Sequence, residues 1–189
     1  MVLNRVLMTA ESQTTELITR DDIVEVLPIR RAAGNIRDDC SVFFSDRNYC
    51  MFTQRFVEID GFNGFKKWIE FNGIRSKGQL KYWKRNYDCD NLANAFKAYM
   101  NLLHARANPL SFTDSFNSGK QNESEAEGVA VGVIYFDIRS GKSLAKHAIN
   151  VVITRGLRNK LIPVYIEPSG AGKINLTKRE KESIWYVNF

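Results

Sequence analysis

The sequence lacks several features that would have assigned it to a large functional class. It has no apolar run near the ~20 residues that a membrane-spanning helix needs, so we expect no membrane span. Segment 1–22 lacks the long apolar stretch of a secretory signal. We therefore expect a protein without a signal peptide, located in a cytoplasm.

Cysteine and histidine are both scarce. The three cysteines, Cys40, Cys50 and Cys89, are an odd number and show no metal-type pair spacing. Reduced thiols are therefore expected rather than a disulfide framework. A zinc site made by Cys89, His147 and an acid would lack a fourth ligand at the usual spacing.

Long runs of basic residues are absent as well. The net charge is +6, but no run of five or more basic residues occurs. Only the net charge supports binding to nucleic acid. A basic surface that faces solvent is therefore the simpler interpretation. Nucleic-acid binding stays as an alternative.

The pattern of apolar residues predicts a single α+β domain with segregated helices and strands. Helices are expected over 62–71 and after Cys89, strands over 129–138, 147–154 and 161–167, and a final strand in the last six residues. Short connections favour an antiparallel meander. A strand is also expected over 23–29, and a short buried segment over 41–46. Pro163 suggests an edge position or a bulge, and Thr177 with Glu180 suggests a helix cap.

The segment NYDCDNLANAF (86–96) places Cys89 where an apolar helix begins. The expected apolar stripe consists of Leu92, Ala93, Phe96, Tyr99, Met100 and Leu103. Asp88 is a plausible N-cap. Free N–H groups and the positive dipole end of a helix lower the pKa of a cysteine. Burial as a small core residue is the alternative for Cys89, and Cys40 and Cys50 are expected to be core thiols.

Only two histidines are present, and their positions differ. His104 lies near the end of the long helix, where a capping or surface role explains it. His147 opens one strand and Glu167 closes the next. If these strands are antiparallel neighbours, His147 and Glu167 lie at one edge of the sheet. A thiol, an imidazole and an orienting carboxylate are what a cysteine peptidase needs.

Three motifs occur in order: YDCDNLANAF, HAINVV and YIEPSG, with a small-residue strand, EGVAVGVIYF, between the first two. Together they resemble the papain-like cysteine peptidase domain found at the C-terminus of a fungal agglutinin, which has bacteriophage-encoded relatives. The resemblance covers roughly 80–170. It implies a papain-like fold, with a long helix that starts at the cysteine and packs on an antiparallel sheet. It also implies Cys89 as nucleophile, His147 as base and Glu167 as orienting carboxylate.

The sequence departs from this family at two positions. Asn91 stands where relatives often carry a second acid, and Ser169 stands where a glutamine often follows Glu-Pro. The family's calcium dependence makes Asp88 and Asp90 the nearest oxygen ligands to suggest, so calcium is an alternative to a reaction without a cofactor. Further residues proposed for substrate contact or support are Asn150, Gln79, Trp83 and Ser169.

The expected function is hydrolysis of a peptide or isopeptide bond through a thioester at Cys89. One alternative is a catalytically silent papain-like fold that serves as a bacteriophage virion, assembly or binding component. Expected partners are a peptide or protein substrate and a virion or homo-oligomeric assembly. The role of 1–75 is left open, 80–170 is the expected peptidase-like core, and 171–189 is expected to add a helical turn and a strand.

Overall fold

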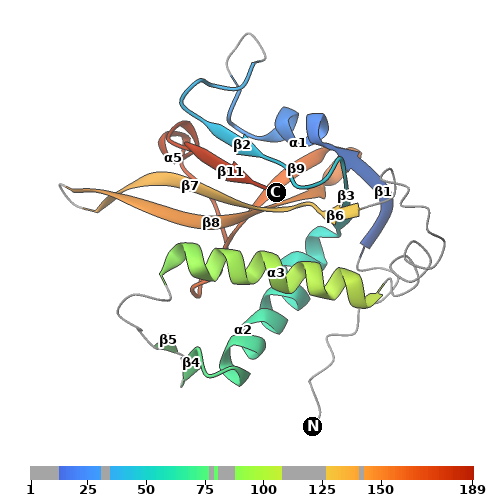
Figure 1. Cartoon of the computed structure of the whole chain (residues 1–189), viewed down its shortest axis with the longest axis vertical. Coiled ribbons are helices and arrows are strands. Elements are labelled where there is room, and N and C mark those ends of the chain that lie inside the picture. Colours follow the sequence, from blue (N-terminus) through green and yellow to red (C-terminus); the bar gives the residue numbers. More distant parts are fainter. Residues whose placement is uncertain (1–12, 31–34, 77–78, 81–87, 108–126, 141–142) are drawn as a thin grey trace.

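The α+β class is confirmed by the computed structural model, which describes residues 13–30, 35–76, 79–80, 88–107, 127–140 and 143–189 (Figure 1). Its main sheet has six strands in the order β10-β9-β8-β7-β11-β2. Their bounds are Gly172–Ile174, Leu161–Glu167, Ser143–Arg155, Val131–Ser140, Tyr186–Asn188 and Ser41–Phe43, respectively. All neighbours are antiparallel except β11 and β2.

The central meander β7-β8-β9 is confirmed, and β8 is longer than predicted. The β7–β8 hairpin stays paired out to Ser140 and Ser143, so β8 begins before His147. β9 pairs with β8 only as far as Ile166 and Asn150, and His147 therefore lies beyond the last paired residue of that interface. Pro163 lies in the part of β9 that β10 does not cover, which agrees with its expected edge position.

The predicted strand 129–138 is divided between two sheets. β6 (Glu127–Val129) joins a second sheet with β1 (Gln13–Thr19) and β3 (Asn48–Phe52), in the order β1-β3-β6. Ala130 lies between β6 and β7, and its N–H and C=O bond to Cys50 and Ile153. A two-stranded ribbon is formed by β4 (Arg75–Ser76) and β5 (Gln79–Leu80).

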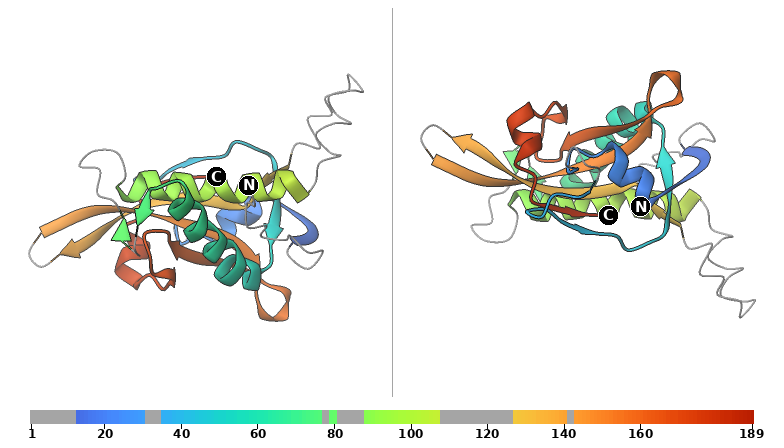
Figure 2. Two further views of the ribbon diagram at one scale, coloured as in Figure 1. Left: turned by 90° about the horizontal axis from the view of Figure 1, so that it is seen from below. Right: turned by 90° about the horizontal axis from the view of Figure 1, so that it is seen from above.

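The long helices lie on one face of the main sheet (Figure 2). α3 spans Cys89–Ala107, and α2 spans Phe62–Phe71 after the π-helical segment Phe56–Gly61. All six residues of the predicted apolar stripe on α3 are buried. All of them except Ala93 pack with α2 and with the sheet residues Val131, Val152, Val164 and Ile166, and Ala93 packs against Val133 and Ala148. α3 therefore rests on β7 and β8, the strands that lead to His147.

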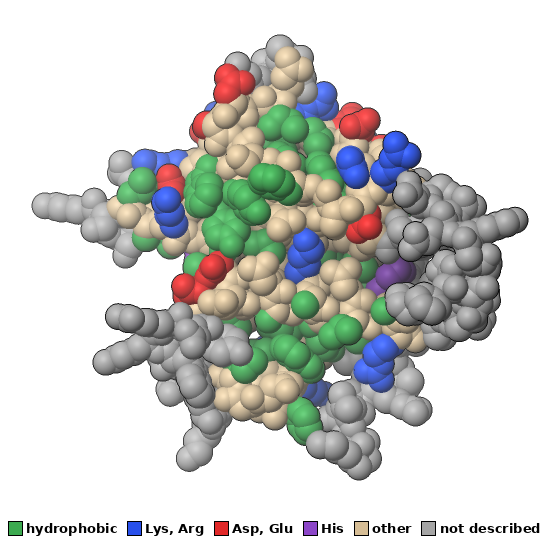
Figure 3. Space-filling view, viewed as in Figure 1, with side chains coloured by type: hydrophobic (Ala, Val, Ile, Leu, Met, Phe, Trp, Pro, Cys, Tyr) green, Lys and Arg blue, Asp and Glu red, His purple; other side chains and the backbone are tan. Residues whose placement is uncertain are grey.

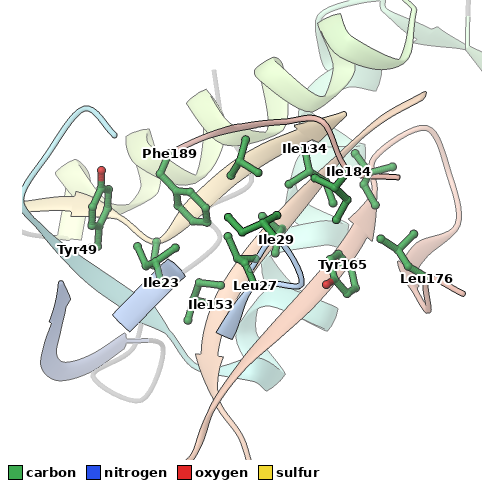
Figure 4. Close-up of a cluster of buried hydrophobic side chains, with 14 of the residues drawn as sticks. Ile23, Leu27, Ile29, Tyr49, Ile134, Ile153, Tyr165, Leu176, Ile184 and Phe189 are labelled. Carbon is green, nitrogen blue, oxygen red and sulfur yellow. The ribbon is translucent and has the colours of Figure 1, made fainter. Parts of the chain in front are cut away.

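A second core fills the opposite face of the sheet (Figure 4). It contains Ile23 from α1 (Arg20–Val26) and Leu27 at the C-cap of this helix, together with Ile134, Ile153 and Phe189. α5 (Lys178–Glu182) begins with the predicted Thr177–Glu180 capping box. Because both faces are packed, the sheet is a rigid support for the residues at its edges.

Two predictions in the N-terminal part are wrong. The expected strand 23–29 is mainly helix α1, because Thr19 and Asp22 form a capping box that starts a helix and outweighs the β-branched residues. The expected buried segment 41–46 contains β2 at the edge of the sheet, where Ser41 and Phe43 are exposed. In the described part of the chain, no helix is long and apolar enough to cross a membrane.

Candidate active site

Cys89 is the first residue of α3, and the chain around it is held by Asp88. The first intrahelical bond runs from the Leu92 N–H to the Asp88 carbonyl, which puts Asp88 at the N-cap position. The Asp88 carboxylate accepts a hydrogen bond from the Asn91 side chain at 2.8 Å and another from the Asn91 backbone. The thiol of Cys89 is half-buried and packs against Ala93, Val133 and Ala148. The helix N-terminus therefore presents its free N–H groups beside this thiol.

His147 lies on β8 directly opposite Phe136 of β7. The two rings make an edge-to-face contact, with their centroids 5.7 Å apart. Phe136 is itself fixed in the core of the opposite face. This contact limits rotation of the imidazole and holds it at the edge of β8.

Glu167 is the last residue of β9, and its side chain reaches His147. Its Oε2 lies 2.5 Å from His147 Nε2. Its Oε1 accepts the Ser169 backbone N–H at 3.1 Å. Burial raises the pKa of this carboxyl, but the hydrogen bonds from His147 and Ser169 outweigh it and leave the pKa below its ordinary value. Glu167 is therefore held as a carboxylate, with Ser169 as its supporting residue.

Cys89 and His147 shift each other's proton affinity in opposite directions. A hydrogen bond from His147 is the main reason that the pKa of Cys89 lies below its ordinary value; burial opposes the shift, and the Ala148 backbone adds to it. Hydrogen bonds with Cys89 and Glu167 raise the pKa of His147 to about 10, against the effect of burial. Near neutral pH this arrangement favours a thiolate beside an imidazolium.

Asp88 and Asp90 lie on either side of Cys89 in the chain, and their side chains interact. Their mutual hydrogen bond lowers the pKa of Asp88 and raises that of Asp90. The Asp88 charge also acts to raise the pKa of Cys89, but it is the smallest of the contributions there. The acidic neighbours therefore do not outweigh His147. No group of three or more His, Cys, Asp or Glu side chains with metal-binding geometry occurs in the described segments.

Asn150 is fully buried and bonds to backbone rather than to the three candidate catalytic residues. Its Nδ2 donates to the carbonyls of Ala93 in α3 and Gly132 in β7, at 2.8 and 3.2 Å. Asn150 therefore fixes the first turns of α3 on the sheet. Asn150 does not bond to the site directly but holds the helix that carries Cys89.

The remaining candidates lie apart from this site or outside the described residues. Trp83 is not described, and for Gln79 only the backbone of β5 is. Cys40 and Cys50 are buried and form no disulfide, and burial raises the pKa of Cys40. His104 is half-buried in the last turn of α3.

Sequence reasoning missed three neighbours of the site, namely Tyr135, Phe136 and Ala148. The signal for Phe136 was available, because a hairpin centred on 141–142 pairs residue 136 with residue 147.

Neither a protein-family model nor a curated protein matches this sequence.

Proposed function

We propose that this protein is a thiol hydrolase with a papain-like arrangement, which cleaves a peptide or isopeptide bond. The observation that carries the proposal is the chain of contacts from Cys89 at the helix start, through His147, to Glu167. A nucleophile, a base and an orienting group in hydrogen-bonded sequence form the minimal set for acyl transfer by a cysteine. The order of the three residues along the chain agrees with the resemblance noted from the motifs.

In the first half of the reaction, the Cys89 thiolate attacks the carbonyl carbon, and a C–S bond forms as the C=O π electrons move to oxygen. The Cys89 backbone N–H, one of the N–H groups at the helix start, donates to this oxyanion. The tetrahedral species then collapses and the C–N bond breaks. The His147 imidazolium gives its proton to the departing nitrogen, leaving a thioester at Cys89.

In the second half, water attacks the thioester carbonyl while neutral His147 removes its proton. The C–S bond breaks, the carboxylic acid leaves, and the thiolate–imidazolium pair is restored. Because Nε2 of His147 is occupied by Glu167, Nδ1 is the nitrogen that exchanges the proton. Glu167 stays ionised and keeps the ring in this orientation.

The test is labelling by an epoxysuccinyl peptide, which alkylates activated cysteines, followed by mass spectrometry. We expect modification of Cys89 well before Cys40 or Cys50, and loss of labelling in Cys89→Ala and His147→Gln. Cys50→Ala is the matched control and should label at the rate of the native protein. If Cys89 reacts no faster than the two buried thiols in the folded protein, the hydrolase proposal is wrong. A catalytically silent binding or assembly component would then be favoured.

A further inference from the structure

Four aromatic side chains form a continuous surface next to Cys89, here called the aromatic shelf: Phe43, Tyr135, Trp185 and Tyr186. The Tyr135 ring lies 5.3 Å from Trp185 and 5.2 Å from Tyr186, centroid to centroid. Phe43 extends the group, 5.4 Å from Tyr186, and is 55% exposed. Figure 3 shows hydrophobic side chains gathered over β2, β11 and β7.

Strand pairing places the shelf on the α3 side of the sheet. Tyr135 is paired with Ala148 on one side and with Tyr186 on the other, so these three residues share a face. Ala148 packs beneath Cys89 and Ala93 of α3. The first turn of α3 therefore covers this face of the sheet at Ala148. Beyond the helix, the same face carries the aromatic shelf.

Tyr135 joins the shelf to the candidate active site. It packs beside Cys89 against the same small residues. Its hydroxyl is hydrogen-bonded to the Asn94 side chain, and Asn94 in turn donates to the Asp90 carbonyl at 2.9 Å. A group lying on the shelf is therefore close to the thiol, and Asp90 is near enough to act electrostatically on the Tyr135 hydroxyl.

The shelf has the properties of a cation-binding surface. Ring faces attract cations through their negative quadrupole, and the Lys146 ammonium already lies 5.0 Å from the centroid of the Trp185 ring. Asp90 acts electrostatically on the Tyr135 hydroxyl and is hydrogen-bonded to Asp88, so this acidic pair adds negative charge where the shelf meets the helix start. A purely apolar substrate group would have to lie against these carboxylates, whereas a basic one would neutralise them.

We propose that the aromatic shelf binds a lysine or arginine side chain of the substrate, on the acyl side of the scissile bond. The acyl side is inferred from the strand order: Glu167 and His147 lie toward β9, where the departing amine is protonated, and the shelf lies toward β11. The inference rests on the proposed function for its substrate, a peptide. A substrate cation there also offsets the Asp88 charge that opposes the thiolate.

Binding is measured in the Cys89→Ala protein, so that the result does not depend on catalysis. Two peptides are titrated that differ at one position, lysine against its uncharged counterpart norleucine, and the indole N–H signal of Trp185 is followed by NMR. The lysine peptide should shift this signal and bind about tenfold more tightly. Tyr186→Leu should abolish the preference, while Phe71→Leu, which alters a 64% exposed aromatic on α2, should keep it.

Equal affinity for the two peptides, tighter binding of norleucine, or no shift of the Trp185 signal with either peptide would overturn the inference. In the native protein, chloromethyl ketones of lysine and norleucine give the corresponding rates at Cys89. An unreactive Cys89 would overturn the hydrolase proposal alone. Equal rates with the two ketones at a reactive Cys89 would overturn the inference alone.

Discussion

His147 Nε2 and Glu167 Oε2 lie 2.5 Å apart, although the residues are 20 positions apart in the chain and outside the paired part of β8 and β9. The contact exists because β9 ends where β8 continues, so that Glu167 turns toward the unpaired edge of β8. It occupies Nε2 of the imidazole and leaves Nδ1 for Cys89. Glu167 thus sets the orientation of the His147 ring and, together with Cys89, raises its pKa.

Replacing Glu167 with Gln should impair catalysis without preventing alkylation of Cys89. The amide cannot balance an imidazolium, so the pKa of His147 should fall from about 10, and the alkaline limit of activity should move to lower pH. Peptide hydrolysis should fall by about 10²-fold or more, since the ring loses its orienting carboxylate. A pH–rate profile checks this, with exposed Glu70→Gln as the control. An unchanged alkaline limit in Glu167→Gln would show that Glu167 does not act on His147.

The same pair should make stability depend on pH. The pKa of His147 is raised, so its contribution is complete below the unfolded value of about 6.5 and is lost as the pH rises toward about 10. The pKa of Glu167 is lowered, so its contribution is present above about pH 4.3 and is lost on acidification. The free energy of unfolding of Glu167→Gln should fall below that of the native protein by about 1–3 kcal/mol, most strongly near pH 5–6.5. Urea unfolding at a series of pH values measures this difference, and a difference that does not vary with pH would contradict it.

The central sheet and α3 could be predicted because their signals are local. The apolar stripe from Leu92 to Leu103 and the short turns around β8 each arise within one or two elements. The hairpin argument likewise placed His147 near Glu167 without any long-range information.

The features that could not be predicted depend on competition between local signals or on contacts between residues far apart in the chain. Residues 23–29 carry a strand-like composition, and a four-residue cap beginning at Thr19 decides for helix. Ala130 divides one apolar run between two sheets because β3 pairs with β6. For Asn150 the sequence leaves substrate contact or support of the site open, and its actual partners, carbonyls of α3 and β7, are ones that no spacing rule identifies.

Replacing Asn150 with Asp should destabilise the protein strongly. The new carboxylate would face the Ala93 and Gly132 carbonyls with no proton to donate, in a fully buried position. We expect a loss of more than about 3 kcal/mol in the free energy of unfolding. Asn72→Asp is the matched control, since Asn72 donates to the Trp68 carbonyl at 2.8 Å but is exposed, and it should lose less than about 1 kcal/mol. Comparable losses in the two variants would contradict the buried role of Asn150.

The double substitution Asp88→Asn and Asp90→Asn tests calcium at the start of α3. If calcium binds these carboxylates, adding it to the native protein should speed alkylation of Cys89, because a cation offsets the Asp88 charge. A chelator should reverse the effect, and the double variant should not respond. Because asparagine also caps helices, the variant should keep α3. A calcium response that survives in the double variant would place the ion elsewhere, and no response in the native protein would argue against calcium.

The most direct test of the account is the pH dependence of the rate at which iodoacetamide alkylates Cys89, in the native protein and in His147→Gln. The account predicts that the native rate reaches half its plateau at a pH below the ordinary thiol value of about 8.5, because His147 stabilises the thiolate. In His147→Gln the midpoint should move up to that value or above it, since burial and Asp88 then act without the imidazolium. A native midpoint at or above about 8.5 that does not move in His147→Gln would contradict the proposed pairing of Cys89 with His147.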